Sequence, residues 1–406
     1  MDGGGNFRGL AMNKLRLVPL ILIFLLLSAV PGSRTDIEPS MIDMEAQLAA
    51  NAWDDRPFFD DSPFNIPIPD NAEIDPLSDA YVNNMVNSMS GEDVYVGIDY
   101  WSVPVFFADS STPLHNVNLT DEWAIWDIME NVPIPDNAVP DPEEDGHLCI
   151  IDNETLIEYD FWQAEKTPAG WTANWGNMIS LNSDGIFTDN WGARASGFAL
   201  ALGLIFPHEI AQGSINHALA YSTDDMYVKA GGPVRPATTS DGYSTDPLAI
   251  PEGTRLQLDP SIDIDSLALS DAGHIIATAM QEYGMILSDL GGGHQIYAYN
   301  PINSDNPNVW NSMLPTDEDG ISWIFESKIS ITDFRVLKIG PQIPDLDVRT
   351  TLPPYILYTT GPSGTTGTTS GTEVTGFEIP DGTSILIAVG IVGVFLIVYV
   401  VIRKRT

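Results

Sequence analysis

The stretch EYDFWQ, Glu158–Gln163, contains side chains that could act on a sugar. If it forms a strand, Glu158, Asp160 and Trp162 point to one face, because successive side chains alternate. Two carboxyl groups beside an aromatic ring suit glycoside hydrolysis, in which one protonates the leaving oxygen while the other attacks. The alternative is a strand with an exposed acidic face.

EYDFWQ also resembles the ExDxxE signature of laminarinase-type, jelly-roll glycoside hydrolases. The resemblance covers six residues and implies a catalytic strand in a jelly roll. In that family the last Glu is the acid/base, whereas Gln163 occupies this position here. Hydrolysis by that mechanism would therefore lack its proton donor.

Two further strand-like stretches present polar side chains at alternate positions. INHALAY places His217 among apolar residues, and TRLQLD places Arg255 and Gln257 opposite two leucines. Polysaccharide lyases use Arg or Gln to neutralise a uronate carboxylate and His or Tyr to remove the adjacent proton. The candidate ligand-binding residues are Trp162, Gln163, Arg194, Arg255 and Gln257, and the candidate catalytic residues are Glu158, Asp160, His217 and Tyr283. The alternatives are a core histidine and an Arg255 ion pair with Asp241 or Asp289.

The charge balance excludes nucleic acid as a partner. The chain has 17 Lys and Arg against 56 Asp and Glu, a net charge of −39, which a phosphate backbone would repel. A saline habitat, bound calcium or a cationic partner could explain this acidity, and surface adaptation is the reading we favour. No DxDxDG loop, HExxH, GxSxG or P-loop is present, so no metal site or cofactor is predicted. Cys149 is the one cysteine and is expected to be a buried thiol.

Both ends of the chain carry signals for a membrane protein. Residues 1–32 have basic residues, an apolar run and a small-residue end, as in a signal peptide. Residues 384–402 are apolar and long enough for a transmembrane helix, and the basic tail 403–406 predicts its cytoplasmic side. Residues 351–383 are rich in Thr, Gly and Ser and predict a stalk. Asn118 and Asn153 match the N-glycosylation acceptor pattern.

The region 34–350 is predicted to be a single extracellular domain. PIPDNA occurs twice, at 67–72 and 133–138, but the segments that follow differ, so we interpret it as one local turn used twice. Many short strand-like runs and few helical ones predict a β-sandwich of jelly-roll type. The helices are expected at 78–89, 121–129, just after Pro207, and at 271–283.

A wider set of motifs resembles an uncharacterised family of secreted bacterial and archaeal domains. The motifs are YDFWQA, GARASG, INHAL, PEGTRLQLDPS and QEYGMILSD, together with the PIPDNA lines. The resemblance implies an intact extracellular module and no particular activity. We therefore expect a single-pass cell-surface protein that engages extracellular carbohydrate. The alternatives are a structural or adhesive surface protein, and a polysaccharide lyase or glycoside hydrolase.

Overall fold

The computed structural model describes residues 56–343 except 123 and 189–190, residues 355–360, and three strands between 373 and 404. The predicted signal peptide at 1–32 and most of the predicted stalk at 351–383 lie outside the described residues. Strands outnumber helices in the described part, which confirms the mainly β class.

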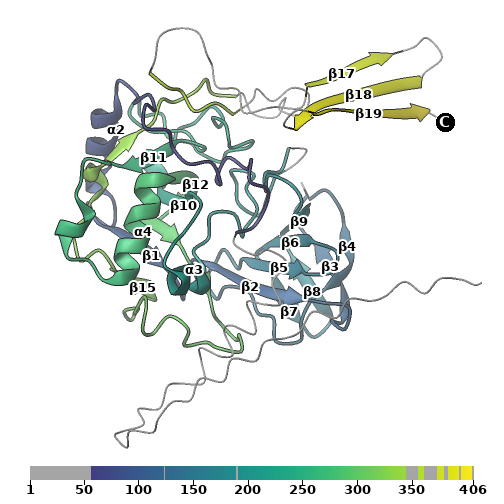
Figure 1. The fold of residues 1–406 in the computed structure, drawn as a ribbon. Coiled ribbons are helices and arrows are strands. Elements are labelled where there is room, and N and C mark those ends of the chain that lie inside the picture. Colours follow the sequence, from purple (N-terminus) through teal and green to yellow (C-terminus); the bar gives the residue numbers. More distant parts are fainter. Residues whose placement is uncertain are drawn as a thin grey trace, which may run out of the picture. The chain divides into compact units, whose positions relative to one another are not determined.

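A seven-stranded mixed sheet forms the larger framework (Figure 1). Neighbouring strands are parallel in β1/β13 and β10/β12 and antiparallel in the other pairs. Every residue of β1, β10, β11 and β13 is buried, as expected for strands covered on both faces. In spatial order the strands are β15 (Ile321–Ser322), β1 (Val94–Gly97), β13 (His294–Tyr297), β10 (Leu219–Asp224), β12 (Met285–Gly291), β11 (Arg255–Leu258) and β16 (Phe334–Val336).

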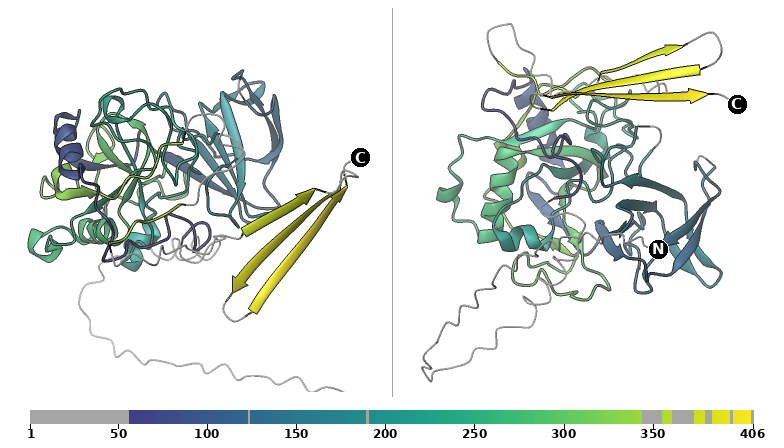
Figure 2. Two further views of the ribbon diagram at one scale, coloured as in Figure 1. Left: turned by 90° about the horizontal axis from the view of Figure 1, so that it is seen from above. Right: turned by 45° about the vertical axis from the view of Figure 1, so that its right-hand side comes forward.

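Helix α4 (Asp271–Glu282) packs against this sheet (Figure 2). It begins where the Ser270 hydroxyl accepts a hydrogen bond from the Gly273 N–H at 3.1 Å, an N-cap that local sequence encodes. It ends before Gly284, which has φ +75° and lies so close to the Leu256 carbonyl that a side chain would clash. The expected helix at 271–283 is therefore confirmed.

The remaining helices are short. Near the predicted 78–89 helix the structure has α2 (Ser78–Asn84) and a 3₁₀ turn, η1 (Met85–Asn87), and the helix after Pro207 is α3 (Pro207–Gln212). The helix expected at 121–129 is wrong. Residues from Ile128 onward instead form β4, which pairs with β3, so strand pairing overrides the local helical spacing. Further 3₁₀ turns are η2 (Asp225–Tyr227), η3 (Ile264–Leu267) and η4 (Ile331–Asp333).

Two smaller sheets pack face to face and form a sandwich over one shared apolar core. The five-stranded sheet has the order β14 (Tyr299–Asn300), β2 (Val103–Ala108), β5 (Leu148–Asp152), β6 (Ile157–Trp162) and β9 (Trp175–Ser180). The four-stranded sheet has the order β4 (Ile128–Pro133), β3 (Leu114–Leu119), β8 (Gly170–Ala173) and β7 (Glu165–Thr167). Parallel pairing in β14/β2, β2/β5 and β3/β8 differs from the antiparallel sheets of a jelly roll.

The five-stranded sheet contributes its two faces to two different cores. Phe106 and Ile150 face the sandwich core, whereas Val105 and Cys149 face a second core. This second core also contains residues of the segment 198–206 and of β10, β12 and β13. Successive side chains of a strand point to opposite faces, so two adjacent apolar residues are buried in different cores. These shared residues support the single-domain prediction for 34–350, which unfolding experiments would test.

The two PIPDNA segments adopt the same local structure. In each, the alanine N–H donates to the carbonyl oxygen three residues earlier: Ala72 to Pro69 at 2.9 Å, and Ala138 to Pro135 at 3.0 Å. The preceding isoleucines, Ile68 and Ile134, are buried in different clusters. The repeat therefore encodes a Pro-Asp-Asn-Ala turn rather than a duplicated domain.

The C-terminal strands are β17 (Glu373–Glu378), β18 (Thr383–Val392) and β19 (Phe395–Lys404), which pair antiparallel. Among the residues described, no helix has the length and hydropathy needed to cross a membrane. The helix expected at 384–402 is thus not seen, and the membrane anchor stays a prediction.

Candidate functional site

Glu158 and Asp160 on β6 form a carboxyl pair inside the protein. Both residues have 0% exposed surface. Glu158 Oε1 accepts the Ala201 N–H at 2.9 Å, and Asp160 Oδ2 accepts the Leu200 N–H at 3.0 Å. Their other oxygens, Glu158 Oε2 and Asp160 Oδ1, have no hydrogen-bond partner among the described residues, and one oxygen of each carboxyl group lies within 4.8 Å of the other. The expected acidic face is therefore turned inward and closed by the segment 198–206.

Burial is the main cause that raises the pKa of both carboxyl groups. The negative charge of Glu158 raises the pKa of Asp160 further. Cys149, opposite Asp160 on β5, is also fully buried, and burial raises the pKa of its thiol. The prediction of a buried thiol is confirmed. A carboxyl pair without exposed surface is not positioned to contact a substrate.

Arg194 provides a cation inside the same polar interior. It has 0% exposed surface, its Nη1 donates to the Leu202 carbonyl at 3.2 Å, and its guanidinium lies 4.7 Å from the Tyr297 ring centroid. Within the described part of the chain, its Nε and Nη2 have no hydrogen-bond partner. Its charge lowers the pKa of the carboxyl pair, although less than burial raises it. Arg194 therefore acts on buried groups rather than on a surface ligand.

Trp162 and Gln163, at the end of β6, are half-buried. The Trp162 indole Nε1 donates to Asp145 Oδ1 at 3.5 Å. The Gln163 amide oxygen accepts from the Asn174 side chain, and its backbone has φ +52°. Both side chains thus have partners from neighbouring strands and loops, which explains why a glutamine can stand at this position.

His217 is buried and paired with a carboxylate. Its Nε2 lies 2.9 Å from Glu209 Oε1, and its Nδ1 lies 2.9 Å from the Ala218 carbonyl oxygen. Both partners are acceptors, so the ring donates from both nitrogens and carries a positive charge. Burial lowers the pKa of His217, but the Glu209 charge and hydrogen bond outweigh it, and the net pKa is raised. Glu209 also accepts the Phe206 N–H at 2.8 Å and so caps α3.

The structure does not join the predicted catalytic residues in one site. Tyr283 follows the last residue of α4 and packs, half-buried, against the second core. His217 and the carboxyl pair have separate hydrogen-bond partners. Among the described residues, no hydrogen bond or ion pair joins the carboxyl pair, His217 and Tyr283 to one another.

Arg255 and Gln257, the polar side chains of β11 that are candidates for ligand binding, are both buried. Gln257 is 4% exposed, accepts from Arg335 Nε at 2.9 Å and Nη2 at 2.7 Å, and donates to the Gln281 carbonyl at 2.6 Å. This is a structural contact between β11, β16 and α4. The face of β11 that carries Arg255 and Gln257 is covered by segments distant in sequence. The alternation pattern within β11 cannot reveal such a cover.

Arg255 is 4% exposed and lies on a cavity. Its Nη1 donates to the Ile66 carbonyl at 3.2 Å, its Nη2 donates to the Pro63 carbonyl, and its guanidinium lies 5.7 Å from the Tyr355 ring centroid. The expected ion pair with Asp241 or Asp289 is wrong, since within the described residues its guanidinium contacts carbonyls and a ring. Burial lowers the pKa of this guanidinium.

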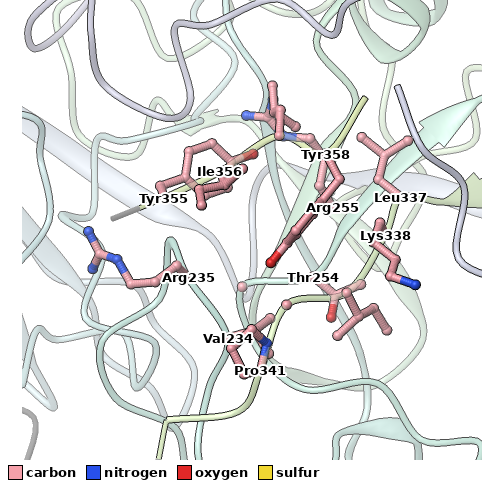
Figure 3. Close-up of a pocket in the computed structure, with 14 residues that line it drawn as sticks. Val234, Arg235, Thr254, Arg255, Leu337, Lys338, Pro341, Tyr355, Ile356 and Tyr358 are labelled. Carbon is pink, nitrogen blue, oxygen red and sulfur yellow. The ribbon is translucent and has the colours of Figure 1, made fainter. Parts of the chain in front are cut away.

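The cavity beside Arg255 has a volume of about 140 Å³ (Figure 3). The described residues that line it include Arg235, Arg255 and Lys338 and no acidic residue. Figure 3 shows Arg235 and Lys338 on opposite sides of it. Among the described residues, Nε of both arginines and the Tyr355 hydroxyl lack a hydrogen-bond partner. The full lining is Val234, Arg235, Gly253, Thr254, Arg255, Leu337, Lys338, Ile339, Gly340, Pro341, Tyr355, Ile356, Leu357 and Tyr358.

Arg235, Lys338 and Tyr355 were not among the residues proposed from the sequence. Arg235 and Lys338 are about a hundred positions apart in the sequence, and Lys338 and Tyr355 are seventeen apart. No local motif connects them. The scarcity of basic residues was the available signal, because 3 of the 17 in the chain line this one cavity.

The two glycosylation acceptors differ in exposure. Asn118 is exposed on β3, whereas Asn153 is half-buried in the turn between β5 and β6. Their modification stays a prediction.

Comparison of this chain with protein-family models, with curated proteins and with solved structures finds no match. The family resemblance therefore depends on the sequence motifs alone.

Proposed function

We propose that the chain is a membrane-anchored cell-surface protein whose ectodomain binds carbohydrate that carries carboxylate groups, in the cavity beside Arg255. The observation that carries this proposal is the composition of the cavity: three basic side chains and no acidic one, in a chain of net charge −39. Three positive side chains around one cavity, in an otherwise acidic protein, attract an anion.

The unpartnered donors support the same ligand chemistry. A buried guanidinium N–H and a buried phenol O–H without partners gain a hydrogen bond when a carboxylate or hydroxyl oxygen enters. Tyr355 and Tyr358 add aromatic surface, on which the apolar face of a sugar can stack. A cavity of about 140 Å³ is close to the size that admits one six-membered ring, so a single uronate residue fits the space better than a chain.

Binding is favoured over catalysis by the positions of the other candidates. Glu158, Asp160 and His217 are buried with partners of their own, and none of them lines the cavity. The lyase and hydrolase hypotheses require an acid or base within reach of the sugar. A structural or adhesive role without sugar binding is the competing outcome of the test.

The test uses Tyr355→Phe in the full chain, purified in detergent. This substitution removes a buried hydroxyl that has no hydrogen-bond partner among the described residues, so stability should be unchanged or slightly higher. Affinity for an oligogalacturonate, measured by calorimetry, should fall roughly 10- to 100-fold, as for a lost hydrogen bond to a charged group. The methyl-esterified oligosaccharide is the uncharged comparison ligand. Tyr100→Phe, at an exposed tyrosine outside the cavity, is the matched control.

Two outcomes would contradict the binding proposal. If the wild-type chain binds neither the acid nor its ester, or if Tyr355→Phe binds as well as wild type, the cavity is not a uronate site. An absence of all sugar binding would favour the structural or adhesive alternative.

The proposed topology is tested separately. Protease added to intact cells should cut the Thr/Gly-rich segment 351–383 and release the ectodomain, because residues 384–402 are proposed to anchor the chain with its N-terminal bulk outside. An ectodomain that is cut only after the cells are lysed would contradict this topology.

A further inference from the structure

We propose that Asp241, Glu252 and Asp289 form a calcium-binding site, which we call the acidic triad. One oxygen from each carboxylate lies within 4.8 Å of the others. Asp289 is on β12, Glu252 lies just before β11, and Asp241 lies in the long connection between β10 and β11. The fold thus brings two positions of this connection together with one position of β12, as the ligands of a built cation site require.

Glu252 is the observation that distinguishes the triad from a chance group of surface acids. It has 0% exposed surface, and within the described residues neither Oε1 nor Oε2 has a partner at hydrogen-bond distance. The Ser240 side chain favours the charged form of Glu252 and so lowers its pKa, but burial raises the pKa of Glu252 by more. A buried carboxylate without partners is costly, so the site requires either a proton or a cation.

The neighbouring charges make the need for a cation stronger. Burial and the charge of Asp241 raise the pKa of both Glu252 and Asp289 well above the ordinary range, and burial raises the pKa of Asp241 to about 6. Asp145 adds a further negative charge that acts on Asp241 and Asp289. Arg194 lowers the pKa of Asp289, but its hydrogen bond goes to the Leu202 carbonyl, so it does not satisfy the triad.

The chemistry of the donors points to calcium. All three ligands are carboxylate oxygens, and a mixture of bidentate carboxylates and water completes the six to eight oxygens that Ca²⁺ takes. Zinc sites are built mostly from Cys and His, which this group lacks. Asp241 is exposed and gives the ion a way in, whereas Glu252 is enclosed.

A second group of three possible metal ligands has similar spacing but differs in burial and hydrogen bonding. It consists of Cys149, Glu158 and Asp160. All three residues are buried, and both carboxyl groups accept backbone N–H donors. Each of these two carboxyl groups thus has one oxygen satisfied by the backbone, whereas neither oxygen of Glu252 has a partner among the described residues. This group therefore provides a buried carboxylate control within the same chain.

The experiment measures the melting temperature of the full chain, purified in detergent and treated with a chelator, with and without CaCl₂. An ion that binds only the folded state should raise Tm by roughly 5 °C at a hundredfold excess over Kd. MgCl₂ at equal concentration should give a smaller shift, because Mg²⁺ demands a stricter octahedral geometry. Calorimetric titration should give about one Ca²⁺ per chain.

Glu252→Gln separates a ligand from a structural residue. Without calcium its Tm should equal or exceed that of wild type, because the amide removes a buried charge, yet its response to calcium should be lost. Glu158→Gln should keep the wild-type response. The proposal is overturned if calcium leaves the wild-type Tm unchanged, if Glu252→Gln responds as wild type does, or if the response is lost in Glu158→Gln instead.

Discussion

Replacing Glu158 with Gln should change how stability depends on pH. In the folded protein Glu158 and Asp160 are fully buried and lie close together, with raised pKa values. A second negative charge is disfavoured in such a buried pair, so we expect the pair to keep one proton above the pH at which the free groups lose it. The unfolded chain has released that proton, because free Asp and Glu have pKa values of about 4.

The sign and size of the effect follow from this proton. A proton taken up on folding lowers the free energy of unfolding by about 1.4 kcal/mol for each unit of rising pH. The contribution of the pair is therefore full below the pKa of the unfolded groups and is lost as the pH rises from there through the raised folded pKa. In the Glu158→Gln variant the new amide oxygen would keep the Ala201 N–H bond, and the amide N–H would donate to Asp160, which then needs no proton.

The assay is urea unfolding of the full chain between about pH 5 and pH 7, in chelator. Glu158→Gln should show a slope shallower than that of wild type by about 1.4 kcal/mol per pH unit. Glu154→Gln, an exposed site in the preceding turn, should run parallel to wild type. Equal slopes for wild type and Glu158→Gln would refute the shared proton.

Three further predictions concern stability. Glu209→Gln should lower the free energy of unfolding by roughly 3–5 kcal/mol in urea melts, because it leaves charged His217 buried without its partner. The pKa of His217 is raised on folding. The stabilisation of the folded state by the His217–Glu209 pair is therefore full below the unfolded pKa of about 6.5 and is lost as the pH rises through the folded pKa. A Glu209→Gln variant whose stability depends on pH as that of wild type does would contradict this. Gln257→Leu should cost about 1–3 kcal/mol by leaving donors of Arg335 unpaired, and an unchanged urea midpoint would argue against that contact. The region 34–350 should unfold in one calorimetric transition, and separate transitions for the sandwich and the seven-stranded sheet would disprove the single domain.

Local signals in the sequence were sufficient for several elements. Ser270 and Gly284 define the ends of α4, Pro207 begins α3, and the PIPDNA turns close through neighbours three residues apart. Alternation also identified β6 and β11 as strands. Each of these features depends on contacts within a few residues, so the short segment already contains the physical cause.

Only the tertiary structure decided which faces are covered and which side chains meet. Alternation placed Glu158 and Asp160 on one face but could not show that the segment 198–206 closes over it. Likewise, Arg255 meets carbonyls near residue 65 and the ring of Tyr355, and the acidic triad joins β12 to the connection between β10 and β11. Burial and the resulting pKa shifts arise from these long-range contacts, because the field at a carboxylate depends on everything packed around it rather than on its neighbours in the chain.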